Sequence, residues 1–229
     1  INSMSTSTNG HFSGAITEFA LFDNVLFGQD QVNELYNDGK ALDVMASSQS
    51  GNCHGYWRNN GLAQWKDLSG NGNHSNTVVG SETMLITAGA DGSRDSQGFL
   101  MNRQRATNAL NNALGTSGIK NYVEMNVGGD DDLAFIGVGH GFSVSVWVKK
   151  YQLSSENQMI VSRNNNVDGW RLQIDSLNKL QFAVEENNNI STGITDSAIS
   201  TDTWYHMVGT FDGDPSNDTS GVVRLYLNG

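Results

Sequence analysis

The stretch FSVSVWV, residues 142–148, decides the fold that this sequence predicts, because every second residue in it is apolar. Successive side chains of a strand point to opposite faces, so this alternation is typical of a strand with one buried face. Four further stretches alternate in the same way: WRLQI (170–174), LQFAV (180–184), WYHMVGTF (204–211) and VVRLYL (222–227). Polar turns separate the stretches, with WRLQI and LQFAV joined by a turn at 175–179. Together they predict an antiparallel β-sandwich.

The composition agrees with an all-β chain and excludes two classes of partner. Only 16% of the 229 residues are charged, and the polar character comes from Asn, Ser, Thr and Gly, which favour turns over helices. The net charge of −11 repels phosphate and anionic lipid, so we expect neither nucleic acid nor a membrane surface as partner. No apolar run approaches the roughly 18 residues of a membrane span, so no membrane insertion is expected.

One short helix is predicted near the start of the chain, over residues 29–37. Within GQDQVNELYNDGK, an apolar stripe of Val32, Leu35 and Tyr36 has helical spacing, and Gly39 is a stop signal. It directly follows an apolar strand expected over 15–22, in which Ile16, Ala20 and Phe22 would share one face.

Several short motifs occur in the order of one known family. They are GYWRNNGLAQWKDLSGNGNHSNTV (55–78), NYVEM (121–125), FSVSVWVKK (142–150), WYHMVGTFD (204–212) and RLYLNG (224–229). In this order they resemble the laminin-G-like, or concanavalin A-like, jelly-roll family. The resemblance implies an all-β antiparallel jelly-roll β-sandwich with one short helix.

The segments that end the fold in that family stand at the front of this chain. GAITEFALFDN (14–24) and VLFGQDQVNELYNDG (25–39) resemble the family's closing strand and helix. We therefore expect residues 1–45 to be the end of a sandwich, 46–54 a connector, and 55–229 a sandwich lacking its final strands. Residues 1–45 would complete the sandwich of the same chain or that of a neighbouring copy.

A second resemblance concerns the context of the protein. Residues 55–103 are similar in style to lectin-like sandwiches in structural proteins of marine tailed bacteriophages. This implies a non-catalytic recognition module on a virion surface, as a capsid decoration or tail-fibre domain. Its partners would be other virion proteins, copies of itself or a cell-surface glycan. The alternative is a carbohydrate-binding module of a secreted, extracellular enzyme or adhesin.

The sequence does not favour an enzyme. A sandwich glycosidase needs two closely spaced carboxylates on one face of a strand, and no such alternation occurs. Glu185 and Glu186 are adjacent, so their side chains would point to opposite faces. Serine-hydrolase, zinc-protease and phosphate-loop motifs are also missing from the sequence.

Two loops are candidates for binding a cation, which would be calcium because the available ligands are oxygens. In DLSGNGNH (67–74) the ligands would be Asp67, Asn71 and Asn73, and the alternative is a network of Asx turns that closes the loop. In FDGDPSNDTSG (211–221) they would be Asp212, Asp214 and Asp218, and the alternative is a solvated hairpin. For the three aspartates at 130–132, a plain acidic loop is the favoured interpretation.

Carbohydrate binding would need an exposed aromatic ring, and the sequence offers five tryptophans: Trp57, Trp65, Trp147, Trp170 and Trp204. A Trp in a sandwich usually belongs to the core, and Trp147 and Trp204 lie in stretches with the family's core pattern. Trp65, beside the polar turn, is therefore the predicted carbohydrate-binding residue. His206 is expected to be packed and structural.

Overall fold

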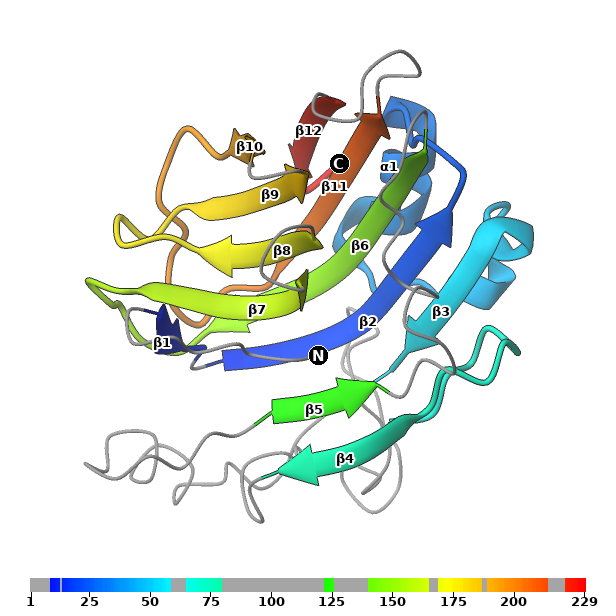
Figure 1. Ribbon diagram of the computed structural model, residues 1–229, viewed down its shortest axis with the longest axis horizontal. Helices are drawn as coiled ribbons and strands as arrows, with labels where there is room; N and C mark the ends of the chain where they lie inside the picture. The colour runs from blue at the N-terminus through cyan, green and yellow to red at the C-terminus, as the bar shows by residue number, and fades with distance from the viewer. Residues whose placement is uncertain are drawn as a thin grey trace.

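The computed structural model describes residues 9–12, 14–58, 65–79, 122–125, 140–164, 169–186, 189–213 and 221–229. In these ranges it contains two five-stranded sheets, a two-stranded sheet and one short α-helix (Figure 1). All strand pairs are antiparallel except the parallel pair of β1 and β7. The predicted all-β sandwich with one helix is therefore confirmed.

Both large sheets bring together strands that are far apart in the sequence. In spatial order, sheet A contains β1 (Asn9–His11), β7 (Asn157–Asn164), β8 (Gly169–Ile174), β9 (Leu180–Glu186) and β10 (Asn189–Ile194). Sheet B contains β12 (Gly221–Leu227), β11 (Tyr205–Gly213), β6 (Gly141–Lys150), β2 (Gly14–Asp23) and β3 (Cys53–Trp57). A third sheet pairs β4 (Ser75–Val79) with β5 (Tyr122–Met125).

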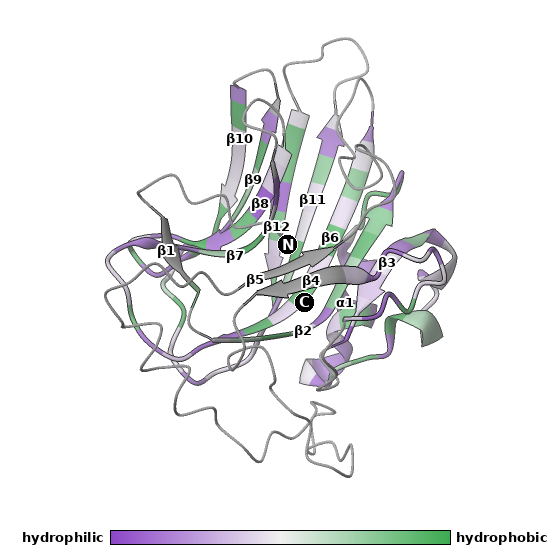
Figure 2. Ribbon diagram, turned by 60° about the horizontal axis from the view of Figure 1, so that its bottom comes forward, coloured by the Kyte–Doolittle hydropathy of each residue, from purple (hydrophilic) through white to green (hydrophobic). Residues whose placement is uncertain are grey.

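The main core lies between sheets A and B. The alternating residues of FSVSVWV supply Phe142, Val144, Val146 and Val148 from sheet B. Trp170, Leu172, Phe182 and Val184 face them from β8 and β9. Figure 2 shows the matching alternation of hydrophobic and hydrophilic bands along strands such as β11. Gly209 in β11 permits this packing, since a Cβ there would lie 2.5 Å from the Cδ1 atom of Phe182.

The opposite face of sheet B carries a second apolar cluster. Helix α1 (Gln29–Tyr36) places Val32 and Leu35 in this cluster with Ala20, Phe22 and Tyr56 of sheet B. Between α1 and β3 the chain forms the short 3₁₀ turns η1 (Asn37–Gly39), η2 (Val44–Ala46) and η3 (Ser50–Asn52), of which η3 lies within the expected connector, 46–54. Sheet B is thus buried on both faces over part of its area.

Strand β2 occupies an interior position of sheet B, between β6 and β3 (Figure 1). A bulge in β2 corrects the predicted distribution of its side chains. The register with β6 shifts between Thr17 and Ala20, where Glu18 has a φ of 49°. Ile16 therefore packs with Phe19 in the core between the sheets, and not with Ala20 and Phe22 as expected. An extra residue in one strand reverses the alternation beyond it.

The described residues contain no helix with the length and apolar character needed to cross a membrane.

Candidate functional site

The turn predicted to bind calcium is a compact network of hydrogen bonds against β3. The Oδ1 atom of Asp67 accepts hydrogen bonds from the backbone N–H groups of Tyr56 and Ser69, both at 2.9 Å. Its Oδ2 atom accepts one from the N–H of Asn73 at 3.0 Å. Both carboxylate oxygens are thus directed at backbone donors of the loop and of the neighbouring strand.

The two asparagines of this turn use their amide nitrogens in the same way. Asn71 Nδ2 donates to the carbonyl oxygen of His54 at 2.9 Å, and Asn73 Nδ2 donates to the same oxygen at 3.1 Å. Among the described residues, no group of three or more His, Cys, Asp or Glu side chains could hold a metal ion. The geometry favours the Asx-turn alternative over the calcium site predicted for Asp67, Asn71 and Asn73.

The second predicted cation loop lies mainly outside the described residues. Asp212 is half-buried in β11, opposite Val222 of β12. Asp214 and Asp218 fall outside the described ranges, as do the aspartates at 130–132. The calcium prediction for this loop therefore stays a prediction.

The prediction that Trp65 provides an exposed carbohydrate-binding ring is wrong for this structure. Trp65 is 7% exposed and packs in the core between the sheets, where its ring cannot form a surface platform. Trp204 is the half-exposed tryptophan, and the Lys149 ammonium lies 5.0 Å from its ring centroid. The sequence pattern predicted a core position for Trp204. In the structure, Trp204 is the residue immediately before β11 and lies outside the strand.

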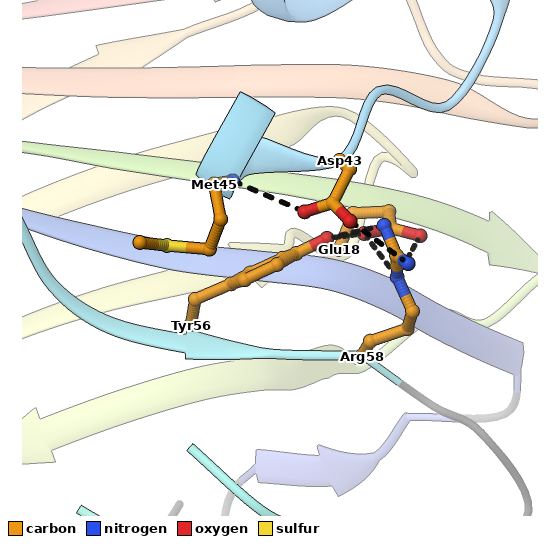
Figure 3. Close-up of polar contacts among 5 residues, drawn as sticks. All are labelled: Glu18, Asp43, Met45, Tyr56 and Arg58. Carbon is orange, nitrogen blue, oxygen red and sulfur yellow. Dashed lines mark hydrogen bonds and ion pairs between the residues drawn. The ribbon is translucent and has the colours of Figure 1, made fainter. Parts of the chain in front are cut away.

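A buried group of charged side chains connects β2 to the residue after β3 (Figure 3). The Arg58 Nε atom lies 2.9 Å from Oε1 and 3.0 Å from Oε2 of Glu18. The Tyr56 hydroxyl donates to Glu18 and accepts a hydrogen bond from Arg58 Nη2 at 2.7 Å. Arg58 Nη1 also contacts Asp43 Oδ2 at 3.4 Å. No sequence motif had singled out these residues.

The electrostatics of this group indicate a structural role. Burial, followed by the charge of Glu18, raises the pKa of Tyr56, so its hydroxyl stays protonated. Burial is the largest influence on the pKa of Arg58 and would lower it. The charge and hydrogen bond of Glu18, together with Tyr56 and Asp43, outweigh burial, and the pKa of Arg58 is raised. Glu18 is almost fully buried and held by Arg58, so it is not available to act on a substrate.

The outward face of sheet A presents a row of paired polar side chains. Arg171 Nη1 lies 3.3 Å from Glu185 Oε2, with side-chain exposures of 21% and 19%. One row along, Gln173 donates a hydrogen bond to Gln181. These side chains point outward because the residues that alternate with them, such as Leu172 and Phe182, fill the core. At the edge of the same face, Thr192 and Ile194 of β10 are exposed.

This polar face was not predicted from the sequence. The WRLQI and LQFAV stretches did show which residues would alternate with the core residues, but no motif marks their outer positions. Only the register of β8 and β9, with Gln173 opposite Gln181, brings the amides together. We treat the face formed by Arg171, Gln181, Glu185 and Thr192 as the candidate recognition face, and Gln173, which is only 5% exposed, supports it through its hydrogen bond to Gln181.

The two face-to-face sheets and their order define a β-sandwich of the concanavalin A type. Residues 116–229 match the family model described as the concanavalin A-like lectin/glucanases superfamily, in agreement with this fold. Comparison with curated proteins and with solved structures gave no match. The superfamily includes enzymes and non-enzymes, and a domain of this type fits a carbohydrate-binding module in general.

Proposed function

We propose that the protein is a non-catalytic recognition module that binds carbohydrate on the recognition face and is displayed on a virion surface. The observation that carries the proposal is the paired polar face of sheet A. Sugar hydroxyls donate and accept hydrogen bonds, and the amide of Gln181 and the pair of Arg171 and Glu185 supply both kinds of group. Because these side chains stand on neighbouring strands and contact one another, their positions are fixed before a ligand arrives.

The proposal that the module is non-catalytic is supported by the ion pairs and hydrogen bonds that occupy the carboxylates. A glycosidase needs an acid and a second carboxylate on either side of the scissile bond. In the described part of the chain, Glu18 is paired with Arg58 and Glu185 with Arg171. The carboxylate of Asp67 accepts three backbone hydrogen bonds. Glu18 and Asp67 are thus held in structural contacts, and the charge of Glu185 on the recognition face is neutralised by Arg171.

Display on a virion is supported by the resemblance of residues 55–103 to lectin-like sandwiches of phage structural proteins. A capsid decoration and a tail-fibre domain both fit that resemblance. The alternative, a carbohydrate-binding module of a secreted enzyme or adhesin, is favoured by the concanavalin A-like match alone. The neighbourhood of the parent gene separates the two: capsid and tail genes support the virion, and a catalytic domain in the same reading frame supports the alternative.

A glycan array tests the carbohydrate-binding part of the proposal. The purified protein is applied to the array with and without a chelator of divalent cations, and the glycans are recovered afterwards for mass analysis. We expect binding to a restricted set of glycans whose masses are unchanged. Absence of binding to every glycan would contradict recognition of carbohydrate. Cleaved glycans would contradict a non-catalytic role.

A further inference from the structure

Residues 14–36, which comprise β2 and α1 and are termed the closing segment, make their principal contacts with distant parts of the chain. Strand β2 pairs with β6 on one side and with β3 on the other. The ring of Tyr36 in α1 stacks on Trp147 of β6, with centroids 5.8 Å apart. Among the described strands of sheet B, β3 is joined to the rest of the sheet through β2. The sandwich therefore needs a closing segment in this position.

The closing segment is joined to β3 by residues 37–52, and this connection begins with unfavourable backbone geometry. Three consecutive residues, Asn37, Asp38 and Gly39, have positive φ values of 48°, 53° and 81°. Two of them carry a Cβ atom, which disfavours this left-handed region, and although Asn and Asp adopt it more readily than other such residues, consecutive ones are costly. The connection folds back onto the helix, since the Ser48 N–H donates to Glu34 Oε1 at 2.7 Å. The closed chain thus contains a strained turn immediately after α1.

We propose that two copies of this chain exchange their closing segments, with residues 37–52 as the hinge. In the exchanged dimer, β2 of each copy lies between β6 and β3 of the other. The contacts of the closing segment with β6 and β3 are kept, as is the ion pair of Glu18 with Arg58, because the residues are identical in both copies. Strand β1 moves with β2 and pairs with β7 of the other copy, and the hinge is the part that changes conformation. Extending the hinge breaks the Ser48–Glu34 hydrogen bond and removes the strained turn. This inference is independent of the proposed carbohydrate binding.

The structure indicates that the segment placed between β6 and β3 comes from a second copy of this chain. The closing segment fits its position through specific features: the bulge at Glu18, the apolar residues on both faces of β2 and the Tyr36 stack. A different protein would have to reproduce all of them. An interior strand that is apolar on both faces is also unstable when left unpaired.

Cross-linking between two different variants tests the exchange. Ala15 in β2 lies opposite Lys149 in β6. An Ala15→Cys variant and a Lys149→Cys variant are unfolded, mixed in equal amounts, refolded at high concentration and oxidised. A disulfide-linked heterodimer is expected in the mixture, because only exchange brings the two introduced thiols of different chains together. Each variant refolded alone is the control for links through the buried native Cys53.

The outcomes decide the proposal. If the mixture stays monomeric, or each variant alone forms as much linked dimer as the mixture, the exchange is overturned. The wild-type chain gives a second measurement that depends on no variant. After refolding, light scattering must show a dimer fraction that rises with protein concentration, and a monomer at every concentration overturns the proposal.

Two hinge variants test the role of the strained turn. Replacing Asn37 and Asp38 by Gly relieves the strain of the closed chain and should lower the dimer fraction. Replacing both by Ala increases the strain and should raise it. The two variants are expected to differ at least about fivefold in their monomer–dimer equilibrium constants, because glycine tolerates positive φ without penalty. Equal constants in the two variants would overturn residues 37–52 as the hinge.

Discussion

Glu18 and Arg58 lie 40 positions apart in the chain, and the Arg58 Nε atom is 2.9 Å from Oε1 of Glu18. Their side chains are 3% and 16% exposed, so the ion pair is largely removed from water. It fastens the bulge of β2 to the residue that follows β3. The cost of leaving one buried charge unpaired is much larger than the net gain from a surface pair.

The Arg58→Met variant should therefore be destabilised by about 3 kcal/mol, since it leaves the carboxylate of Glu18 buried without its partner. The Asp43→Ala variant is the matched control, because Asp43 also contacts Arg58 but is 48% exposed. Its expected loss is at most about 1 kcal/mol. Urea unfolding monitored by tryptophan fluorescence measures both. Equal losses in the two variants would show that burial of the Glu18–Arg58 pair is not the decisive factor.

Asn178 is predicted to be the most sensitive residue of the β8–β9 turn. Its Oδ1 atom accepts hydrogen bonds from Lys150 Nζ at 3.1 Å and from the Ser154 N–H at 3.2 Å. It also has a φ of 64°, which asparagine and glycine tolerate best. The Asn178→Ala variant should lose about 2–4 kcal/mol.

The Asn178→Gly variant separates the two contributions, because glycine accepts the backbone angle but not the hydrogen bonds. It should lie between the wild type and Asn178→Ala in thermal stability. If the alanine and glycine variants have equal thermal stability, the left-handed conformation of residue 178 does not contribute to stability.

The stability of the protein should fall in mild acid because of His206. Its ring is buried against the rings of Tyr36 and Trp147, and Ser145 Oγ lies 2.9 Å from Nε2. Burial lowers the pKa of His206 to about 3. The unfolded chain takes up a proton near pH 6.5 and the folded chain does not, so acid favours the unfolded state. The contribution is about 1.4 kcal/mol for each pH unit below pH 6.5, down to about pH 3.

A His206→Gln variant provides the comparison, because it cannot take up this proton. The difference in unfolding free energy between wild type and variant should shrink as the pH falls from 7 to 4. Chemical unfolding at each pH gives this difference directly. A difference that does not change with pH would rule out a buried neutral His206.

The turn around Asp67 is predicted to be independent of metal. Asp67→Ala removes the acceptor of three backbone hydrogen bonds and should destabilise the protein by about 2–3 kcal/mol. Addition of EDTA to the wild type should leave its melting temperature unchanged. A fall in melting temperature with EDTA that calcium reverses, and that Asp67→Ala abolishes, would restore the calcium site predicted from the sequence.

The fold was predictable where one face of a strand is buried throughout. The stretch 142–148 alternates strictly and forms the centre of sheet B. The strands missed by the sequence analysis do not alternate in this way. In β7 the register with β8 shifts between Met159 and Val161, and β10 is a polar edge strand with exposed residues such as Thr192.

The candidate sites were harder to predict because their properties depend on contacts between distant residues. The polar turn at Asp67 was recognised, but its sequence fits calcium ligation and Asx turns equally well. The burial of Trp65 depends on packing that its polar neighbours do not reveal. Glu18 and Arg58 belong to separate parts of the chain, so no local pattern could place them together.

Binding of carbohydrate by the recognition face is the central claim, and one titration tests it most directly. The preferred glycan from the array is titrated calorimetrically into the wild type, a Gln181→Ala variant and an Arg224→Ala variant. Gln181 lies on the recognition face, whereas Arg224 is exposed on β12 of the other sheet. We predict that Gln181→Ala weakens binding about tenfold, the cost of a hydrogen bond to a polar ligand, while Arg224→Ala binds like the wild type. Unchanged affinity in Gln181→Ala, or loss of binding in Arg224→Ala, would contradict the account.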